Sequence, residues 1–173
     1  TFNGTTPDFL LDGSTSFDGT NDYISMSFNE SGNYTISAWF KIDTTQASGI
    51  VEWGDQDDGE RRSLFLWNGG SGAYKLYSST YGSNIAGGTS LSTGVWYHGA
   101  VTVDVSDGSA KVYLNGSLDG TGTNDINSFS GTTGYIGKTG NNEFFKGDIA
   151  NVGIWNRALS ASEIESIYWR GSY

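Results

Sequence analysis

Two tryptophans stand at the ends of hydrophobic runs, directly beside turns. Trp53 closes GIVEW, and Trp67 closes RSLFLW. An aromatic ring in such a place can stack on the apolar face of a sugar ring, while polar neighbours bind the hydroxyl groups. Tyr77 and Tyr81, in or near a short polar region rich in glycine, offer the same flat face and a hydroxyl. With Asn141 they form a candidate ligand-binding set, and ordinary sheet packing is the alternative for the aromatic members.

The most acidic loop, GDQDDGE, follows the first of these tryptophans. Asp55 and Asp57 within it are candidate polar contacts for a ligand, and the loop is also a candidate calcium site at the rim. It is not an EF-hand loop, because its glycine falls one place early and its twelfth position would be a leucine. The alternative is a solvated turn that Arg61 and Arg62 partly neutralise.

Catalytic groups are scarce. The chain has no cysteine, which excludes a disulfide framework, a thiol nucleophile and a zinc site with cysteine ligands. His98 is the only histidine, and no Ser–His–Asp constellation surrounds it in the sequence. We find no nucleophile–base pair and no pair of carboxylates on a strand with the spacing that glycoside hydrolysis needs. The sequence therefore predicts a protein without enzymatic activity and a strand histidine that is packed or at the surface.

Composition limits the class of partner. The 173 residues carry a net charge of −10, which repels phosphate backbones, so we expect neither nucleic acid nor an anionic membrane as a partner. No apolar run approaches the roughly 20 residues of a membrane helix, so no membrane insertion is expected. The length suits a single domain over residues 1–173, beginning abruptly at Thr1 as if cut from a longer polypeptide.

Short hydrophobic runs separated by turn residues predict an all-β fold. Aromatic residues make up 14% of the chain, with 26 glycines and one proline. In YTISAWFKI, the residues Ile36, Ala38 and Phe40 share one face, and Asn115-Gly116 is a strong signal for a two-residue hairpin turn. Trp39, Trp96 and Trp155 are expected to pack in the core or on a sheet face. The predicted strands cover residues 21–28, 34–42, 49–53, 62–67, 73–78, 95–105, 110–114, 133–137 and 144–155.

One helix start interrupts this pattern near the end of the chain. Ser160 and Glu163 have the spacing of a capping box, in which each side chain binds the backbone of the other residue. Ile164 and Ile167 then follow at helical spacing. We expect a single short helix over residues 161–169 that lays an apolar stripe on the β domain.

Three segments resemble the laminin-G-like and pentraxin-like group of the concanavalin A-like jelly rolls. They are SFDGTNDYISM (16–26), WYHGAVTVDVSDGSAKVYLNGSL (96–118) and GDIANVGIWNRALSASEIESIY (147–168). The resemblance spans residue 14 to the end and implies a two-sheet antiparallel jelly-roll sandwich. It says little about the ligand, because one fold supports many functions.

The resemblance also suggests a structural calcium site. The first and last strands of this fold commonly lie near each other, so Asp18, Asn21 and Asp148 could share one ion; ordinary turns are the alternative. The pentraxin calcium loop is not matched, because Glu143 is the only acid in KTGNNEFFK. Ala150 stands where many laminin-G-like modules carry an acid, which weakens the calcium hypothesis.

These observations favour a non-catalytic, lectin-like module that binds glycans or a surface polysaccharide through aromatic residues at the loop edge. The alternative is a structural or adhesion domain of a virion, fibre or cell surface that contacts neighbouring protein subunits. Either reading predicts an extracellular, cell-surface or virion-surface location. The acid–x–acid strand motif of jelly-roll glycoside hydrolases is not matched, which supports the expectation of no catalysis.

Overall fold

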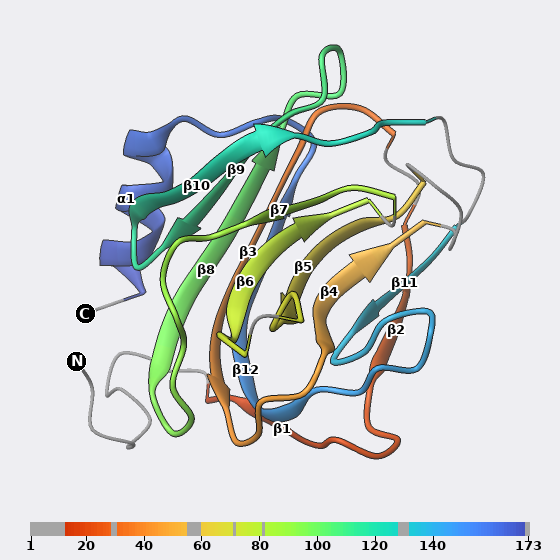
Figure 1. The fold of residues 1–173 in the computed structure, drawn as a ribbon, viewed down its shortest axis with the longest axis vertical. Coiled ribbons are helices and arrows are strands. Elements are labelled where there is room, and N and C mark those ends of the chain that lie inside the picture. The colour runs from red at the N-terminus through yellow and green to blue at the C-terminus, as the bar shows by residue number, and fades with distance from the viewer. Residues whose placement is uncertain are drawn as a thin grey trace.

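Two antiparallel sheets stack face to face in the computed structural model, which describes residues 13–28, 31–54, 60–70, 72–80, 82–127 and 132–171. Within these residues each sheet has six strands, and one helix lies on the outer side of the first sheet (Figure 1). The predicted all-β jelly-roll sandwich with one short C-terminal helix is confirmed. The first sheet has the order β1 (Thr15–Asp18), β12 (Lys146–Trp155), β3 (Tyr34–Ile42), β8 (Trp96–Val103), β9 (Ser109–Leu114), β10 (Ser117–Thr123). The second has the order β2 (Ile24–Ser27), β11 (Thr133–Ile136), β4 (Ser48–Trp53), β5 (Arg62–Trp67), β6 (Lys75–Ser79), β7 (Asn84–Ala86).

The core lies between the two sheets and follows the two-residue period of the strands. Ile36, Ala38 and Phe40 of β3 are fully buried in it, as their alternation predicts. Leu64 and Leu66 of β5 face them from the second sheet. The residues of β5 that alternate with these leucines therefore point to the outer face of the second sheet.

Trp53 belongs to this core, so the prediction that it forms a sugar platform is wrong. Its side chain is 0% exposed. Its ring centroid lies 4.8 Å from that of Phe28 and 5.2 Å from that of Tyr34, both edge-on. The alternation in GIVEW explains the placement: Glu52 points outward, so Val51 and Trp53 point inward together.

The predicted hairpin joins β9 and β10. Asn115 and Gly116 have φ angles of 50° and 79°, the positive values that a type I′ turn requires at both central residues. Leu114 pairs with Ser117 across the turn. Asn115 also accepts a hydrogen bond from the backbone N–H of His98 at 3.0 Å, which ties the turn to β8.

The helix α1 (Ala161–Arg170) begins at the predicted cap. The Ser160 hydroxyl accepts a hydrogen bond from the Glu163 N–H at 3.3 Å, and the Ser160 N–H donates to the Glu163 carboxylate at 2.8 Å. Arg157 donates two hydrogen bonds, of 3.0 and 2.7 Å, to the same carboxylate. These bonds hold the pKa of Glu163 at about 2. Ile164, on the inner face of the helix, is fully buried and packs with Ala100 on the outer side of the first sheet.

Removing this cap should destabilise the fold modestly. We expect Ser160→Ala to lower the free energy of unfolding by about 1 kcal/mol, because one N-terminal N–H of the helix loses its partner. For a domain of this size that is about 2–4 °C in Tm, measured by calorimetry. Ser166→Ala, in the exposed helix interior, is the matched control and should change Tm less. If the two substitutions lowered Tm equally, the cap at Ser160 would make no specific contribution to stability.

The outer face of the first sheet carries a second aromatic cluster beside the helix. Trp39 and Trp96 are each 2% exposed, and the Tyr168 ring stacks on Trp39 at 5.6 Å, which confirms these tryptophans as sheet-face packing. Trp155 is half-buried at the end of β12. His98 is 1% exposed, 5.6 Å from Trp39 and 5.9 Å from Tyr168 by ring centroids. Neither of its ring nitrogens has a hydrogen-bond partner in the described structure, and burial lowers the pKa of His98 to about 4.

Candidate functional site

The outer face of the second sheet carries aromatic residues where the sequence predicted a binding site. Phe65 and Trp67 alternate with the two core leucines of β5 and therefore point outward. Phe65 lies directly opposite Tyr77 of β6 in the sheet register. The rings of Trp67 and Tyr77 are 5.8 Å apart between centroids. The result is a short aromatic row across two neighbouring strands.

A pocket of about 220 Å³ opens beside this row. Trp67, which is half-buried, and Asn141, which is exposed, both line it, although 74 residues separate them in sequence. The fold thus brings together two of the predicted ligand-binding residues. We call this cavity the Trp67 pocket, and its lining residues are Arg61, Phe65, Trp67, Asn84, Asn141 and Glu143.

Tyr77 plays a different part from the one predicted. It is 7% exposed and does not line the Trp67 pocket, so its ring supports Trp67 from the side and presents little face to a ligand. Desolvation raises the pKa of its hydroxyl. Asp55, Asp57 and Tyr81 lie outside the described residues, so their assignment to the site stays a prediction.

Two charges of opposite sign lie beneath the aromatic row. Arg61 Nε is 3.7 Å from the Glu52 carboxylate, with side-chain exposures of 6% and 1%. The Glu52 carboxylate also accepts the N–H of Gly140 at 2.7 Å, and Arg61 donates to the Ser79 hydroxyl. The guanidinium carbon of Arg61 lies 5.2 Å from the centre of the Phe65 ring. An unpaired buried charge would be strongly unfavourable, so this pairing permits an arginine in the pocket wall.

The loop between β11 and β12 supplies the other wall. The Lys138 ammonium lies 4.3 Å from the Tyr23 ring centre and 4.2 Å from that of Tyr135, and it donates to the Asn142 side chain at 3.1 Å. Such contacts are worth about 0.5–2 kcal/mol each. Lys138 also pairs with Phe144 in an isolated β-bridge. The bridge closes the loop that carries Asn141 and Glu143.

Close backbone contact seats this loop on β4. The Gly49 N–H donates to the Glu143 carbonyl at 3.3 Å, and a Cβ at Gly49 would come within 2.5 Å of the Lys138 carbonyl oxygen. A glycine is therefore required there for the loop to lie against the strand. The Thr139 hydroxyl donates to the Glu143 carboxylate at 3.0 Å, which orients that side chain.

Sequence reasoning missed part of the pocket wall. Phe65 was detectable, because alternation places it on the face of Trp67 two residues away. Arg61 and Glu143 were noticed only as a neutralising charge and as an isolated acid. Asn84, from the short strand β7, carried no local signal. The meeting of β5 with the loop at Glu143 depends on long-range strand pairing that no local pattern shows.

The two acidic residues predicted to bind calcium, Asp18 and Asp148, already have polar partners within the protein. Asp148 is bound by Ser16 Oγ at 2.5 Å and Lys41 Nζ at 2.7 Å. Burial alone would raise the pKa of Asp148, but these contacts outweigh it and the pKa lies below its ordinary value. Asp18 accepts the backbone N–H groups of Thr20 and Asn21, at 2.7 and 3.3 Å, which lower its pKa.

In the register of β1 and β12, Asp148 lies opposite Ser16 while Asp18 lies opposite Lys146, so the two carboxylates are diagonal neighbours and not a directly opposed pair. In the part of the chain that the structure describes, no group of three or more His, Cys, Asp or Glu side chains could hold a metal ion. The polar contacts of Asp18 and Asp148 therefore have a structural explanation that needs no ion.

Removing divalent cations should accordingly leave the protein unchanged. We expect EDTA to shift Tm by no more than the error of the measurement, because Lys41 already neutralises Asp148. A structural calcium ion at 100 times its Kd would contribute about 2.7 kcal/mol. Removal of such an ion would lower Tm by about 5 °C or more. A fall of that size would support the calcium site predicted from the sequence.

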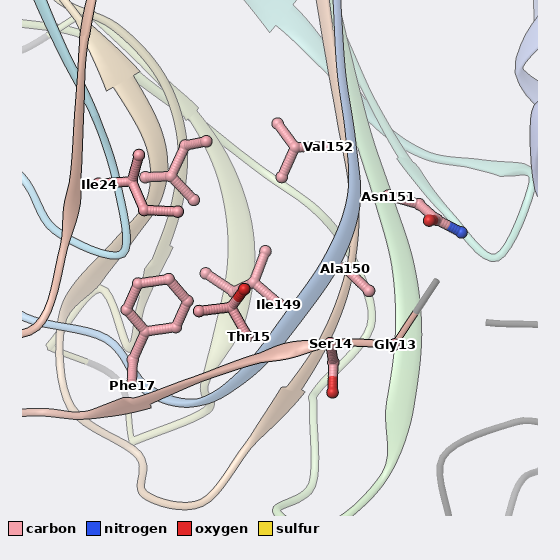
Figure 2. A pocket seen from close by; sticks show the side chains of 10 residues that line it. Gly13, Ser14, Thr15, Phe17, Ile24, Ile149, Ala150, Asn151 and Val152 are labelled. Atoms are coloured by element: carbon pink, nitrogen blue, oxygen red, sulfur yellow. The ribbon is translucent and has the colours of Figure 1, made fainter. Parts of the chain in front are cut away.

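A second cavity, of about 230 Å³, opens between the sheets near β1. Figure 2 shows Phe17, Ile24 and Ile149 gathered around it, with Ser14 and Asn151 at its edge pointing elsewhere. Its lining residues include no charged side chain. It is therefore the open margin of the hydrophobic core, and it offers fewer orienting polar groups than the Trp67 pocket.

The two packed six-stranded antiparallel sheets place the protein in the class of jelly-roll sandwiches. The sequence matches the Laminin_G_3 profile, described as the concanavalin A-like lectin/glucanases superfamily, over residues 18–165. The chain therefore belongs to this family. Comparison with curated protein sequences gives no match.

Solved structures share the fold at low sequence identity. The native heptameric SAP-like pentraxin of Limulus polyphemus is 19% identical, with a TM-score of 0.72 over 88% of this chain and 80% of that chain. Domain 4 of AbnA, a GH43 extracellular arabinanase from Geobacillus stearothermophilus solved with arabinotriose, is 24% identical, with a TM-score of 0.68 over 90% and 76%. A putative carbohydrate binding protein from Bacteroides ovatus is 23% identical, with a TM-score of 0.69 over 88% and 45%.

Proposed function

We propose that this domain is a non-catalytic carbohydrate-binding module and that its ligand occupies the Trp67 pocket. The observation that carries the proposal is the meeting of Trp67 with Asn141 and Glu143 around one cavity. Trp67 offers a half-buried π-face for the C–H face of a sugar ring. The amides of Asn84 and Asn141 can both donate and accept, which suits sugar hydroxyls.

The carboxylates favour binding over catalysis. Glycoside hydrolysis uses two carboxyl groups on either side of the scissile bond. Glu143 is the only carboxylate among the described lining residues, and Glu52 beneath the pocket is bound to Arg61 and the Gly140 N–H. A carboxylate held in this way is poorly placed to act as a nucleophile or to donate a proton.

Exposed apolar residues give little support to the alternative role in protein adhesion. The large exposed hydrophobic side chains of the described residues are Tyr23, Ile24, Leu118 and Trp169. The first two lie by β2, and the other two lie on β10 and α1. They thus form two small groups, one at β2 and one where α1 meets β10, and small exposed apolar groups are ordinary on folded domains. A protein partner would therefore have to be recognised mainly through polar contacts.

We also propose where the domain is located. A glycan-binding role suits an extracellular, cell-surface or virion-surface setting. The absence of cysteine from the sequence is compatible with that setting. Among the described residues, no helix has the length and apolar character needed to cross a membrane.

The test is a binding measurement on paired tryptophan variants. We expect wild-type protein to bind at least one neutral oligosaccharide on a glycan array that includes arabinotriose. Trp67→Ala should weaken that binding more than tenfold in a calorimetric titration, because the stacking face is lost. Trp169→Ala, an exposed tryptophan on α1, should bind like the wild type. Unchanged binding by Trp67→Ala, or no glycan bound by the wild type, would overturn the proposal.

A further inference from the structure

We propose that the Trp67 pocket selects uncharged sugars and disfavours those that carry a carboxylate, such as uronic and sialic acids. This inference rests on the proposed function and specifies its ligand class. It follows from the charges in and around the pocket.

Among the described lining residues, Arg61 is the one cation, and it is already paired. Arg61 is 5% exposed, lies 3.7 Å from Glu52 and donates to the Ser79 hydroxyl. Recognition of a sugar carboxylate by arginine uses two parallel hydrogen bonds from an accessible guanidinium. The guanidinium of Arg61 lies over the Phe65 ring, and its charge is balanced by Glu52. An incoming carboxylate would have to compete with that partner.

The remaining charge in the lining is negative. Glu143 is half-buried in the wall, and its carboxylate accepts a hydrogen bond from the Thr139 hydroxyl at 3.0 Å. With Arg61 and Glu52 cancelling, Glu143 leaves the described lining with a charge of about −1, on a chain whose net charge is −10. A second carboxylate in the same pocket would be repelled, and the pocket wall lowers the screening by water.

Two lysines lie nearby, and neither lines the pocket. Lys138 is 8% exposed, and its ammonium is held by aromatic rings and by Asn142. Lys75 lies opposite Trp67 in the register of β5 and β6. Of these two described lysines, Lys75 is the one that could offset Glu143 from outside the cavity, so the experiment includes it as a variant.

The experiment compares ligands that differ in charge. The neutral probes are arabinotriose, galactotriose, lactose and the methyl ester of trigalacturonate; the acidic probes are trigalacturonate and sialyllactose. At pH 7 and low salt we expect neutral probes to be bound, and each acid to bind about tenfold or more weakly than its neutral partner. Glu143→Gln should reduce the difference in affinity between trigalacturonate and its methyl ester. High salt should reduce this difference in affinity as well.

The affinities for these probes decide whether the pocket disfavours acidic sugars. An acidic probe bound as tightly as its neutral partner would overturn the charge selection while leaving carbohydrate binding intact. If that binding were lost in Lys75→Met, the lysine would be identified as the carboxylate receptor. The inference would also be contradicted if Glu143→Gln left the difference in affinity between the methyl ester and trigalacturonate unchanged. Binding of none of these probes would overturn this inference, whereas the proposed function would fall only if the wild type bound no glycan on the array either.

Discussion

Trp53→Ala is expected to lower the free energy of unfolding by about 3–5 kcal/mol. The side chain is 0% exposed and packs edge-on against Phe28 and Tyr34, so its removal leaves a cavity that the two sheets cannot close. In a domain of this size the loss amounts to a fall of about 6–20 °C in Tm, measured by calorimetry.

Trp67→Ala is the matched comparison, since both tryptophans end a strand beside a turn. It removes a half-buried ring from the outer face and should lower Tm much less than Trp53→Ala does. The reverse ranking, with a stable Trp53→Ala protein that has lost sugar binding, would reinstate Trp53 as a ligand platform and contradict the described core.

Acidification is expected to destabilise the fold before most carboxylates titrate. His98 has a folded-state pKa of about 4 against an ordinary value of 6.5, because its ring is buried. Between these values the unfolded chain binds a proton that the folded protein does not, so stability falls as the pH drops from 6.5 to 4. The loss from this one group is about 2 kcal/mol by pH 4.5.

The measurement is the free energy of unfolding at several pH values, compared with His98→Phe. The phenylalanine keeps an aromatic ring between Trp39 and Tyr168 but cannot bind a proton. Its stability should therefore change less than that of the wild type between pH 6.5 and 4.5. Below that window, Asp18, Asp104, Asp148 and Glu163, whose pKa values are lowered, add a further loss in both proteins. Parallel curves above pH 4.5 would show that His98 is not buried in its neutral form.

Local features of the fold were predictable because local chemistry determines them. The turn at Asn115-Gly116 needs two positive φ angles, and the cap at Ser160 needs a partner three residues later; both are visible in the sequence. The same two-residue period could have separated the two strand-end tryptophans. Trp53 shares the face of Val51, whereas Trp67 shares the face opposite Leu64 and Leu66.

The pocket itself was less predictable, because strand pairing over long distances assembles it. Asn141 reaches Trp67 only because the loop after β11 folds over Gly49 of β4. The protein partner of Asp148, a predicted calcium ligand, could not be seen in the sequence for a similar reason. Asp148 lies opposite Lys41 across β12 and β3, and no local pattern shows that this lysine neutralises it.

The central claim, that a sugar occupies the Trp67 pocket, is tested most directly by the indole N–H signals of the six tryptophans in a ¹H–¹⁵N NMR spectrum. They are recorded while the tightest-binding neutral oligosaccharide of the array is added, and the Trp67 signal is assigned as the one missing in Trp67→Phe. We predict that this signal shifts in a saturable way while that of Trp169 stays in place. A bound sugar that leaves the Trp67 signal unmoved, or that shifts the Trp39 and Trp96 signals of the opposite face instead, would contradict the account.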